Sequence, residues 1–240
     1  MIKRITFIFS AMILLSTHVQ ASLTVDRTRV IYDMEKPGVS VVVENTDTKD
    51  PFLLQTWIES SKGEKITEPL VALPLLQRIE PGQKKQIRIN SVNQTAQLPQ
   101  DRETLFYFNV LGIPPKSQLE NVVEVVIQSR FKLFYRPKGL AKYPKYDWQK
   151  KLTLTREGNS LVLTNPTPYH VIIININDSM QQVKDFPEII IKPLSNVRYP
   201  LTAQQKTASE MVLTYMDDYG TPNVLKYQCN GMTCLLKSQP

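Results

Sequence analysis

The longest regular alternation of apolar and polar residues in the chain spans residues 121–136. From Val123 to Tyr135, six of the seven odd-numbered positions are apolar, whereas only three of the eight even-numbered positions from Val122 to Arg136 are apolar. A period of two is that of a β-strand with one apolar and one mostly polar face. The β-branched residues at the start favour a strand over a helix, because they lose rotamer freedom on a helix. The pattern predicts a strand roughly twice the usual length of five or six residues.

A strand of this length has two interpretations, which the pattern does not separate. It is either a central strand buried on one face or a strand at a sheet edge. An apolar edge with unpaired N–H and C=O groups tends to aggregate, so we expect a soluble protein to keep one only for pairing with a partner strand. An aromatic strand at residues 105–110 leads into the long strand through a short connection at Pro114 and Pro115. We therefore expect a hairpin whose long strand is the last of its domain.

The rest of the chain is expected to be β-structure as well, because short alternating segments are separated by turn residues and no helical period extends far. Trp57 is expected to anchor a sandwich core. A Pro-, Lys- and Tyr-rich stretch indicates a linker between two domains. The expected strands lie within residues 22–32, 39–43, 52–59, 85–89 and 105–110, then 152–155, 161–164, 171–176, 188–191, 211–216 and 224–229, with a loop or edge strand at 70–76.

These boundaries predict an all-β protein with two domains. The N-terminal domain takes residues 22–137, the linker 138–147 and the C-terminal domain 148–240. Each domain has about the 100 residues of a β-sandwich.

The first 21 residues have the features of a secretory signal peptide. Lys3 and Arg4 precede an apolar run at residues 5–15, and Val19 and Ala21 occupy the small-residue positions of a cleavage site. The run is too short to span a bilayer, which takes about 20 residues. Removing residues 1–21 leaves 219 of the 240 residues and lowers the net charge from +7 to +5, because the segment carries two basic and no acidic side chains. We expect an exported, soluble protein.

The mature chain has few of the residues and motifs that a catalytic, cofactor or metal site requires. Its single histidine, His170, begins an apolar strand and is expected at the surface or as a cap, and one histidine does not build a His-rich zinc site. Glycine motifs for phosphates, dinucleotides or a nucleophile elbow are absent. Asp217 and Asp218 are adjacent and would face opposite sides of a strand. Basic residues are dispersed, which argues against nucleic acid. We expect neither an enzyme nor a cofactor.

Cys229 and Cys234 are the two cysteines of the chain, and the intervening Asn230–Gly231 is typical of a tight hairpin turn. In an oxidising compartment this spacing favours a structural disulfide across the hairpin. A redox-active pair is the alternative, but the spacing is not CxxC and no helix start follows.

Arg29 and Lys132 each lie in the middle of an expected strand. A long cationic side chain is unusual there unless a carboxylate or a cleft accommodates it. The simpler interpretation is that both side chains point to water. Composition alone does not decide between this interpretation and a carboxylate or cleft that accommodates them.

Several longer motifs follow one another along the mature chain: VDRTR at residues 25–29, LPQDRETLFYFN at 98–109, IPP at 113–115, FKLFYRP at 131–137, NPTPY at 165–169 and DYG at 218–220. Together, and in this order over the whole mature chain, they resemble the motifs of the PapD-like periplasmic pilus-assembly chaperones. The resemblance implies two immunoglobulin-like sandwiches arranged as a boomerang with a cleft between them. It also implies that the last strand of the first domain completes pilin subunits, which are then delivered to an outer-membrane usher. The short connection between Val110 and Val122 and the lack of cysteines in the first domain are similar to the short-loop subgroup.

The resemblance assigns roles to individual residues. It makes Val123, Val125 and Ile127 the side chains lent to the pilin core. It makes Arg29 and Lys132 the anchor for the pilin's C-terminal carboxylate, and these cations are expected to lack a protein partner in the free chaperone. The expected inter-domain charge network consists of Glu103, Arg136 and Asp218.

Two other classes of function remain as alternatives at this point. A fibre subunit or adhesin would be expected to carry a donor extension at its N-terminus, whereas strand-like sequence begins within three residues of Ser22. A lectin-like or carbohydrate-processing sandwich is disfavoured because a suitable pair of acids is missing. Whether the free protein caps its own strand by forming a homodimer is left open.

Overall fold

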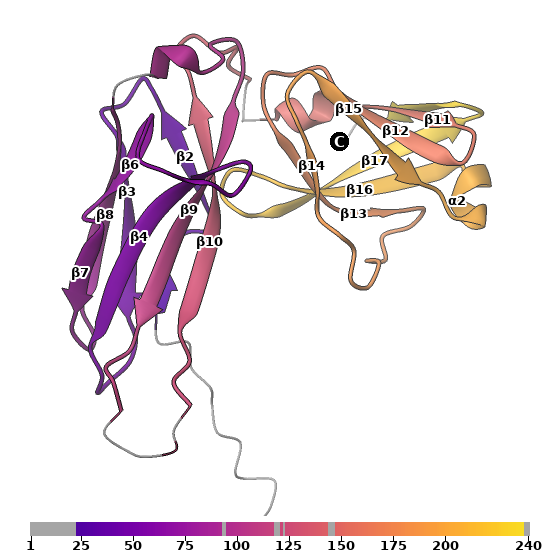
Figure 1. Ribbon diagram of the computed structural model, residues 1–240. Coiled ribbons are helices and arrows are strands. Elements are labelled where there is room, and N and C mark those ends of the chain that lie inside the picture. Colours follow the sequence, from indigo (N-terminus) through magenta and orange to yellow (C-terminus); the bar gives the residue numbers. More distant parts are fainter. Residues whose placement is uncertain (1–22, 93–94, 118–120, 122, 144–146, 238–240) are drawn as a thin grey trace, which may run out of the picture.

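The structure is a computed structural model that describes residues 23–92, 95–117, 121, 123–143 and 147–237. The expected signal peptide, residues 1–21, lies outside this part, and so does Val122. Figure 1 shows two β-domains set at an angle to each other, which is the expected boomerang. Within the described residues no helix is long and apolar enough to cross a membrane.

The first domain consists of two sheets packed face to face. The order of strands in one sheet is β1 (Leu23–Val25), β3 (Val39–Asn45), β8 (Lys84–Ser91) and β6 (Leu70–Leu73). The order in the other is β2 (Arg29–Asp33), β10 (Ile127–Arg136), β9 (Thr104–Ile113), β4 (Phe52–Ser60) and β5 (Lys65–Ile66), and β7 (Leu76–Ile79) also pairs with β4.

The core of the first domain lies between these sheets and follows the alternation of the strands. Leu54 and Ile58 on β4 are fully buried against side chains such as Ile87 on β8. Trp57 therefore lies on the outer face of β4, and the expectation that it anchors the core is wrong. Its Nε1 donates to Glu59 Oε1 at 2.9 Å. Apolar residues occupy both faces of this segment, so the sequence pattern did not indicate which face is buried.

The second domain is a continuous path of hydrogen-bonded strands that encloses one core. Its first and last strands, β14 and β15, contact each other. The path runs through β14 (Ile189–Ile191), β13 (Val171–Asn177), β16 (Glu210–Met216), β17 (Pro222–Asn230), β18 (Thr233–Leu236), β11 (Thr153–Glu157), β12 (Ser160–Asn165) and β15 (Ser195–Pro200). Among the described residues, the short helices are η2 (Thr95–Gln97), η4 (Trp148–Lys151) and α2 (Ala203–Thr207).

Strand β10 is shorter than the alternation predicted, because it begins at Ile127 rather than at residue 121. Ile127 pairs with Gly112, and β9 ends one residue later at Ile113, where Pro114 follows. Residues 123–126 thus continue the apolar pattern without a partner strand to pair with. The odd-numbered face of β10 is buried at Leu133 and Tyr135. The same face reaches beyond the core of its own domain at Ile127.

Strand β10 is also not the outermost strand of its sheet. Strand β2 lies beside it in parallel, but the paired residues run only from Lys132 with Arg29 to Arg136 with Asp33. Among the described strands, none pairs with β10 on this side from Ile127 to Phe131. The result is a strand with a covered half and an open half.

Candidate functional site

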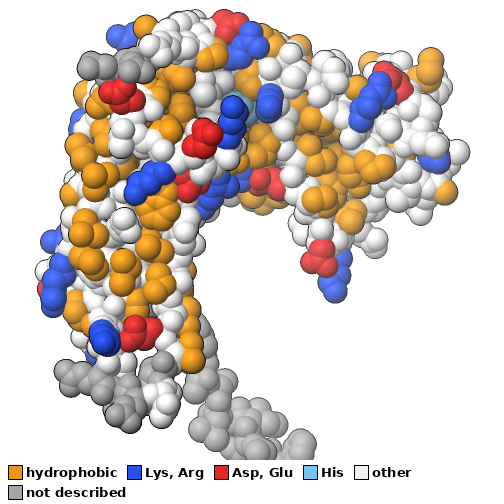
Figure 2. All heavy atoms as spheres, viewed as in Figure 1, with side chains coloured by type: hydrophobic (Ala, Val, Ile, Leu, Met, Phe, Trp, Pro, Cys, Tyr) orange, Lys and Arg blue, Asp and Glu red, His pale blue; other side chains and the backbone are white. Residues whose placement is uncertain are grey.

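The open half of β10 and the residues just before it combine unpaired backbone with exposed apolar side chains. The exposed fractions are 86% for Val123, 67% for Val125 and 56% for Ile127. Figure 2 shows hydrophobic side chains on the surface of the first domain. Large apolar side chains and free N–H and C=O groups together are the features that a partner strand requires. Val123 and Val125 lie ahead of β10, and Ile127 is its first residue.

Arg29 and Lys132 lie side by side where the open half of β10 ends. They are register partners on the parallel strands β2 and β10. Arg29 is only 8% exposed, and within the described residues its Nε has no hydrogen-bond partner. Its Nη1 is 3.5 Å from the carbonyl oxygen of Met216, which is at the limit for a hydrogen bond. A buried guanidinium with unsatisfied donors is suited to receive an anion.

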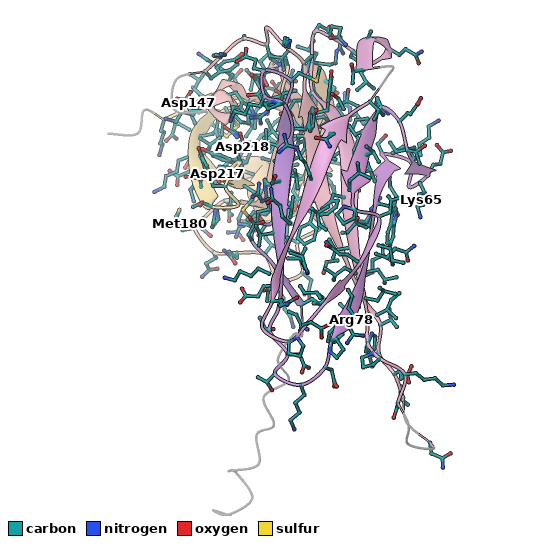
Figure 3. All side chains as sticks on the ribbon, turned by 90° about the vertical axis from the view of Figure 1, so that its left-hand side faces the viewer. Lys65, Arg78, Asp147, Met180, Asp217 and Asp218 are labelled. Atoms are coloured by element: carbon teal, nitrogen blue, oxygen red, sulfur yellow. A yellow bond between two sulfur atoms is a disulfide. The ribbon has the colours of Figure 1, made fainter. Side chains whose placement is uncertain are left out.

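The electrostatics around Arg29 come from both domains. Burial lowers the pKa of its guanidinium, and the carboxylates of Asp218, Glu188 and Asp217 oppose that shift. All three carboxylates belong to the second domain. In Figure 3, Asp217 and Asp218 lie next to each other on the side of the molecule away from Lys65 and Arg78.

Lys132 has a partner, contrary to expectation. Its Nζ is 2.7 Å from Oε1 and 2.8 Å from Oε2 of Glu188, which lies immediately before β14 in the second domain. Glu188 is a site residue that the sequence motifs did not indicate. Nothing in its local pattern marks it, because the contact joins positions that are 56 residues apart.

Glu103, Arg136 and Asp218 meet at the junction of the domains. Arg136 donates from Nε to Glu103 Oε1 at 2.6 Å, and from Nη1 and Nη2 to the two carboxylate oxygens of Asp218 at 2.8 Å each. These side chains are 12%, 1% and 15% exposed, in the order Arg136, Glu103 and Asp218. Burial raises the pKa of Asp218, and Arg136 opposes this shift. The three residues therefore form one largely buried network that joins the domains.

His170 is also part of this junction, and the expectation of a surface or capping position is wrong. It is 8% exposed. Its backbone N–H donates to Glu103 Oε2 at 2.7 Å, and its Nδ1 is 3.0 Å from the same oxygen. Its ring centroid is 5.3 Å from that of Phe134 on β10. The histidine immediately precedes the apolar strand β13, but the sequence did not show that this strand starts against the other domain.

Aromatic rings and a cavity complete the junction. The guanidinium of Arg136 lies 5.1 Å from the ring centroid of Trp148 and 5.0 Å from that of Tyr169, which allows cation–π attraction. A cavity of about 470 Å³ is lined by Arg29 and Arg136 from the first domain and by Asp218 and Tyr219 from the second. Within the described residues no cluster of His, Cys, Asp or Glu is suited to hold a metal ion. The guanidinium groups of Arg29 and Arg136 that line this cavity are suited to binding an anion.

The two cysteines form the expected disulfide. Cys229 on β17 and Cys234 on β18 are directly opposite each other across the hairpin.

Both halves of the chain match models of known domains. Residues 22–141 match the N-terminal PapD domain of the pili and flagellar-assembly chaperones, and residues 147–227 match the C-terminal domain of the pili assembly chaperone PapD. The chain belongs to the PapD-like pilus-assembly chaperones. This family consists of chaperones rather than enzymes, and membership does not favour the fibre-subunit or adhesin alternative.

Individual PapD-like relatives cover nearly the whole chain. The probable fimbrial chaperone YfcS of Escherichia coli strain K12 is 44% identical over 217 residues, which are 89% of this chain and 85% of YfcS. The chaperone protein PapD of Escherichia coli is 36% identical over 222 residues, which are 91% of each chain. The structure of the Salmonella enterica SafA pilin in complex with the SafB chaperone aligns with a TM-score of 0.75 at 22% identity, over 89% of this chain and 99% of that chain. At this identity the structural likeness shows the fold alone.

Proposed function

We propose that this PapD-like chaperone works in the periplasm, where it holds a pilin subunit by adding the open half of β10 to the subunit's fold. Arg29 and Lys132 anchor the pilin's C-terminal carboxylate, and the chaperone delivers the complex to an outer-membrane usher. The observation that carries this proposal is the position of the two cations at the point where β2 begins to cover β10.

The covering strand defines where a bound strand has to stop. A guest strand that pairs with the open edge of β10 meets β2 at Lys132 and extends no further. If the guest stops there with its C-terminus, its terminal carboxylate comes to Arg29 and Lys132. The guest then runs in the same direction as β10, as β2 does. The anchor also sets the register, and a slip of one residue would turn every guest side chain to the wrong face.

The donated side chains are Val123, Val125 and Ile127. They continue the odd-numbered face of β10, which is buried at Leu133 and Tyr135 within its own domain. A guest whose core lacks a strand gains the same kind of burial from these residues. That SafB was solved with the pilin SafA supports a pilin as the guest.

Three further parts of the proposal concern the setting of the chaperone. Residues 1–21 act as a cleavable signal peptide for export. The open edge of β10 pairs with a second copy in the absence of pilin, so that the free chaperone is a self-capping homodimer. The chaperone is a member of the short-loop subgroup, and the short connection between β9 and β10, residues 114–126, supports this part of the proposal.

The anchor is tested with Arg29→Ala and Lys132→Ala in chaperone that is co-expressed with the pilins of its own system. Removing one partner from such a charge pair typically costs about 2 to 5 kcal/mol, or roughly thirtyfold to several thousandfold in affinity. We expect both variants to keep native circular dichroism and thermal stability but to lose copurifying pilin. Lys84→Ala is the matched control, because Lys84 pairs with Glu44 at 3.3 Å on the other sheet. Normal pilin recovery with both anchor variants would reject the anchor.

A further inference from the structure

The ammonium group of Lys132 is already bound to a carboxylate in the free protein. Both oxygens of Glu188 lie within 2.8 Å of its Nζ. Lys132 belongs to the first domain and Glu188 to the second, so the contact spans the junction. This is the chemistry that a peptide's terminal carboxylate would bring to the same ammonium group.

Glu188 acts on Arg29 as well. It is one of the three carboxylates that raise the pKa of the Arg29 guanidinium against the effect of burial. Arg29 itself keeps a buried Nε without a hydrogen-bond partner among the described residues. A single side chain of the second domain thus partly neutralises both cations, yet leaves donors of Arg29 unused.

A second carboxylate at this place would meet the negative charge of Glu188. Two carboxylates that share one site repel each other, so a bound peptide terminus and Glu188 cannot both hold the ammonium group equally well. Glu188 is able to move away, because its side chain is 38% exposed and that of Lys132 is 22% exposed. Ion pairs as exposed as this one are weak, so the contact yields to a guest that also gains backbone hydrogen bonds.

We propose that Glu188 is a built-in competitor that occupies the carboxylate anchor in the free chaperone and has to leave when a C-terminus binds. The inference rests on the proposed role of Arg29 and Lys132 as that anchor. A competitor at this place would make the anchor selective for pilin strands over small carboxylate ions. A small carboxylate ion would have to displace Glu188 without any compensating contact. A pilin strand displaces it with the help of pairing along β10.

The experiment measures the Kd of a synthetic peptide that carries the C-terminal strand of a copurified pilin. The peptide is used with a free carboxylate and with an amidated C-terminus, against wild type and Glu188→Gln. We expect Glu188→Gln to tighten binding of the free acid about two- to fivefold, which corresponds to about 0.4 to 1 kcal/mol. Binding of the amide is expected to stay unchanged.

Glu157→Gln is the matched control. It removes the same charge from the same domain, where Glu157 pairs with Arg198 at 2.6 Å and is 46% exposed. Glu157 ends β11, away from the junction with the first domain (Figure 1). We expect this variant to bind both peptides like wild type. In a Lys132→Ala background, Glu188→Gln is expected to tighten binding of the free acid less than in wild type, because only its effect on Arg29 remains.

The outcomes separate this inference from the proposed function. Suppose that wild type binds the free acid more tightly than the amide, and that Glu188→Gln leaves this preference unchanged or reduces it. That result would overturn the proposal that Glu188 is a competitor, but it would leave the carboxylate anchor supported. Equal binding of acid and amide by both proteins would reject the anchor, and the competitor with it. A gain of the same size with the amide would show that Glu188 acts on something other than the terminal carboxylate, and would also overturn the inference.

Discussion

Arg136 binds two carboxylates from different domains and lies close to the rings of Trp148 and Tyr169. The carboxylates of Glu103 and Asp218 raise the pKa of the guanidinium even though its burial works in the opposite direction. The arginine is therefore held in its charged form. A network of this kind is sensitive to the loss of one member, because the remaining charges stay buried without a partner.

We expect Arg136→Ala to lower the free energy of unfolding by about 3 to 5 kcal/mol, as found when one partner of a buried ion pair is removed. Urea unfolding followed by circular dichroism measures this change. Arg198→Ala is the control, since Arg198 is 60% exposed in its pair with Glu157 and its loss should cost less than about 1 kcal/mol. Similar losses for the two variants would show that the junction network is not a special source of stability.

The sequence motifs led to Arg29, Lys132, Glu103, Arg136 and Asp218, and the structure brings these residues to one junction. Glu188 and His170 were not found, for a shared physical reason. Each contacts a residue of the other domain, more than 50 positions away. Alternation along a strand indicates which face is buried, but it carries no information on which distant charge lies across an interface.

At the scale of the elements, β10 shows that alternation of apolar and polar residues does not by itself fix where a strand begins. The alternation continues back to Val123, but a strand also needs a neighbour to pair with, and β9 ends at Ile113. The all-β class and most strands followed from local alternation. The open half of β10 did not, because it depends on where β2 lies, and β2 is almost 100 residues earlier in the chain.

Ile127→Glu tests whether this element is lent to a partner. A charge on the donated face should block entry into an apolar groove, so we expect normal folding and loss of copurifying pilin. The control is Val126→Glu, which places the same charge on the opposite face of the chain, where Val126 is 50% exposed. We expect it to retain most pilin. Full recovery with Ile127→Glu would indicate that this face does not enter the pilin.

At the scale of the whole molecule, the angle between the domains also depends on one close approach. Gly220 follows Asp218 in the connection between β16 and β17, and its φ is +82°. A Cβ atom at this position would lie 2.2 Å from Oγ1 of Thr28, which immediately precedes β2. The second domain therefore approaches the first at a point where a side chain would force them apart.

We expect Gly220→Ala to destabilise the chaperone and to weaken pilin binding, because both anchor cations, Arg29 and Lys132, lie against the second domain at this junction. Gly158→Ala is the matched control, since Gly158 has a φ of +58° but nothing within 4 Å of an added Cβ. That variant should show only the cost of the left-handed backbone, about 1 to 2 kcal/mol. Thermal unfolding and small-angle X-ray scattering measure the two effects.

Adding Thr28→Ala to Gly220→Ala should restore part of the loss, because it removes the nearest atom. If Gly220→Ala and Gly158→Ala behaved alike, the contact with Thr28 would not govern the domain angle.

The exposed segment at residues 123–126 has a consequence for how the chaperone is degraded. Its residues are exposed and belong to no strand, and exposed segments outside regular structure are preferred sites of cleavage. A protease that cuts after valine should cleave the uncovered chaperone in this segment, between the neighbouring strands β9 and β10, before it cleaves within either domain core. A pilin that covers the segment would protect it. The rate of this cut then reports, without any label, what fraction of the chaperone has this segment uncovered by a subunit or by a second copy.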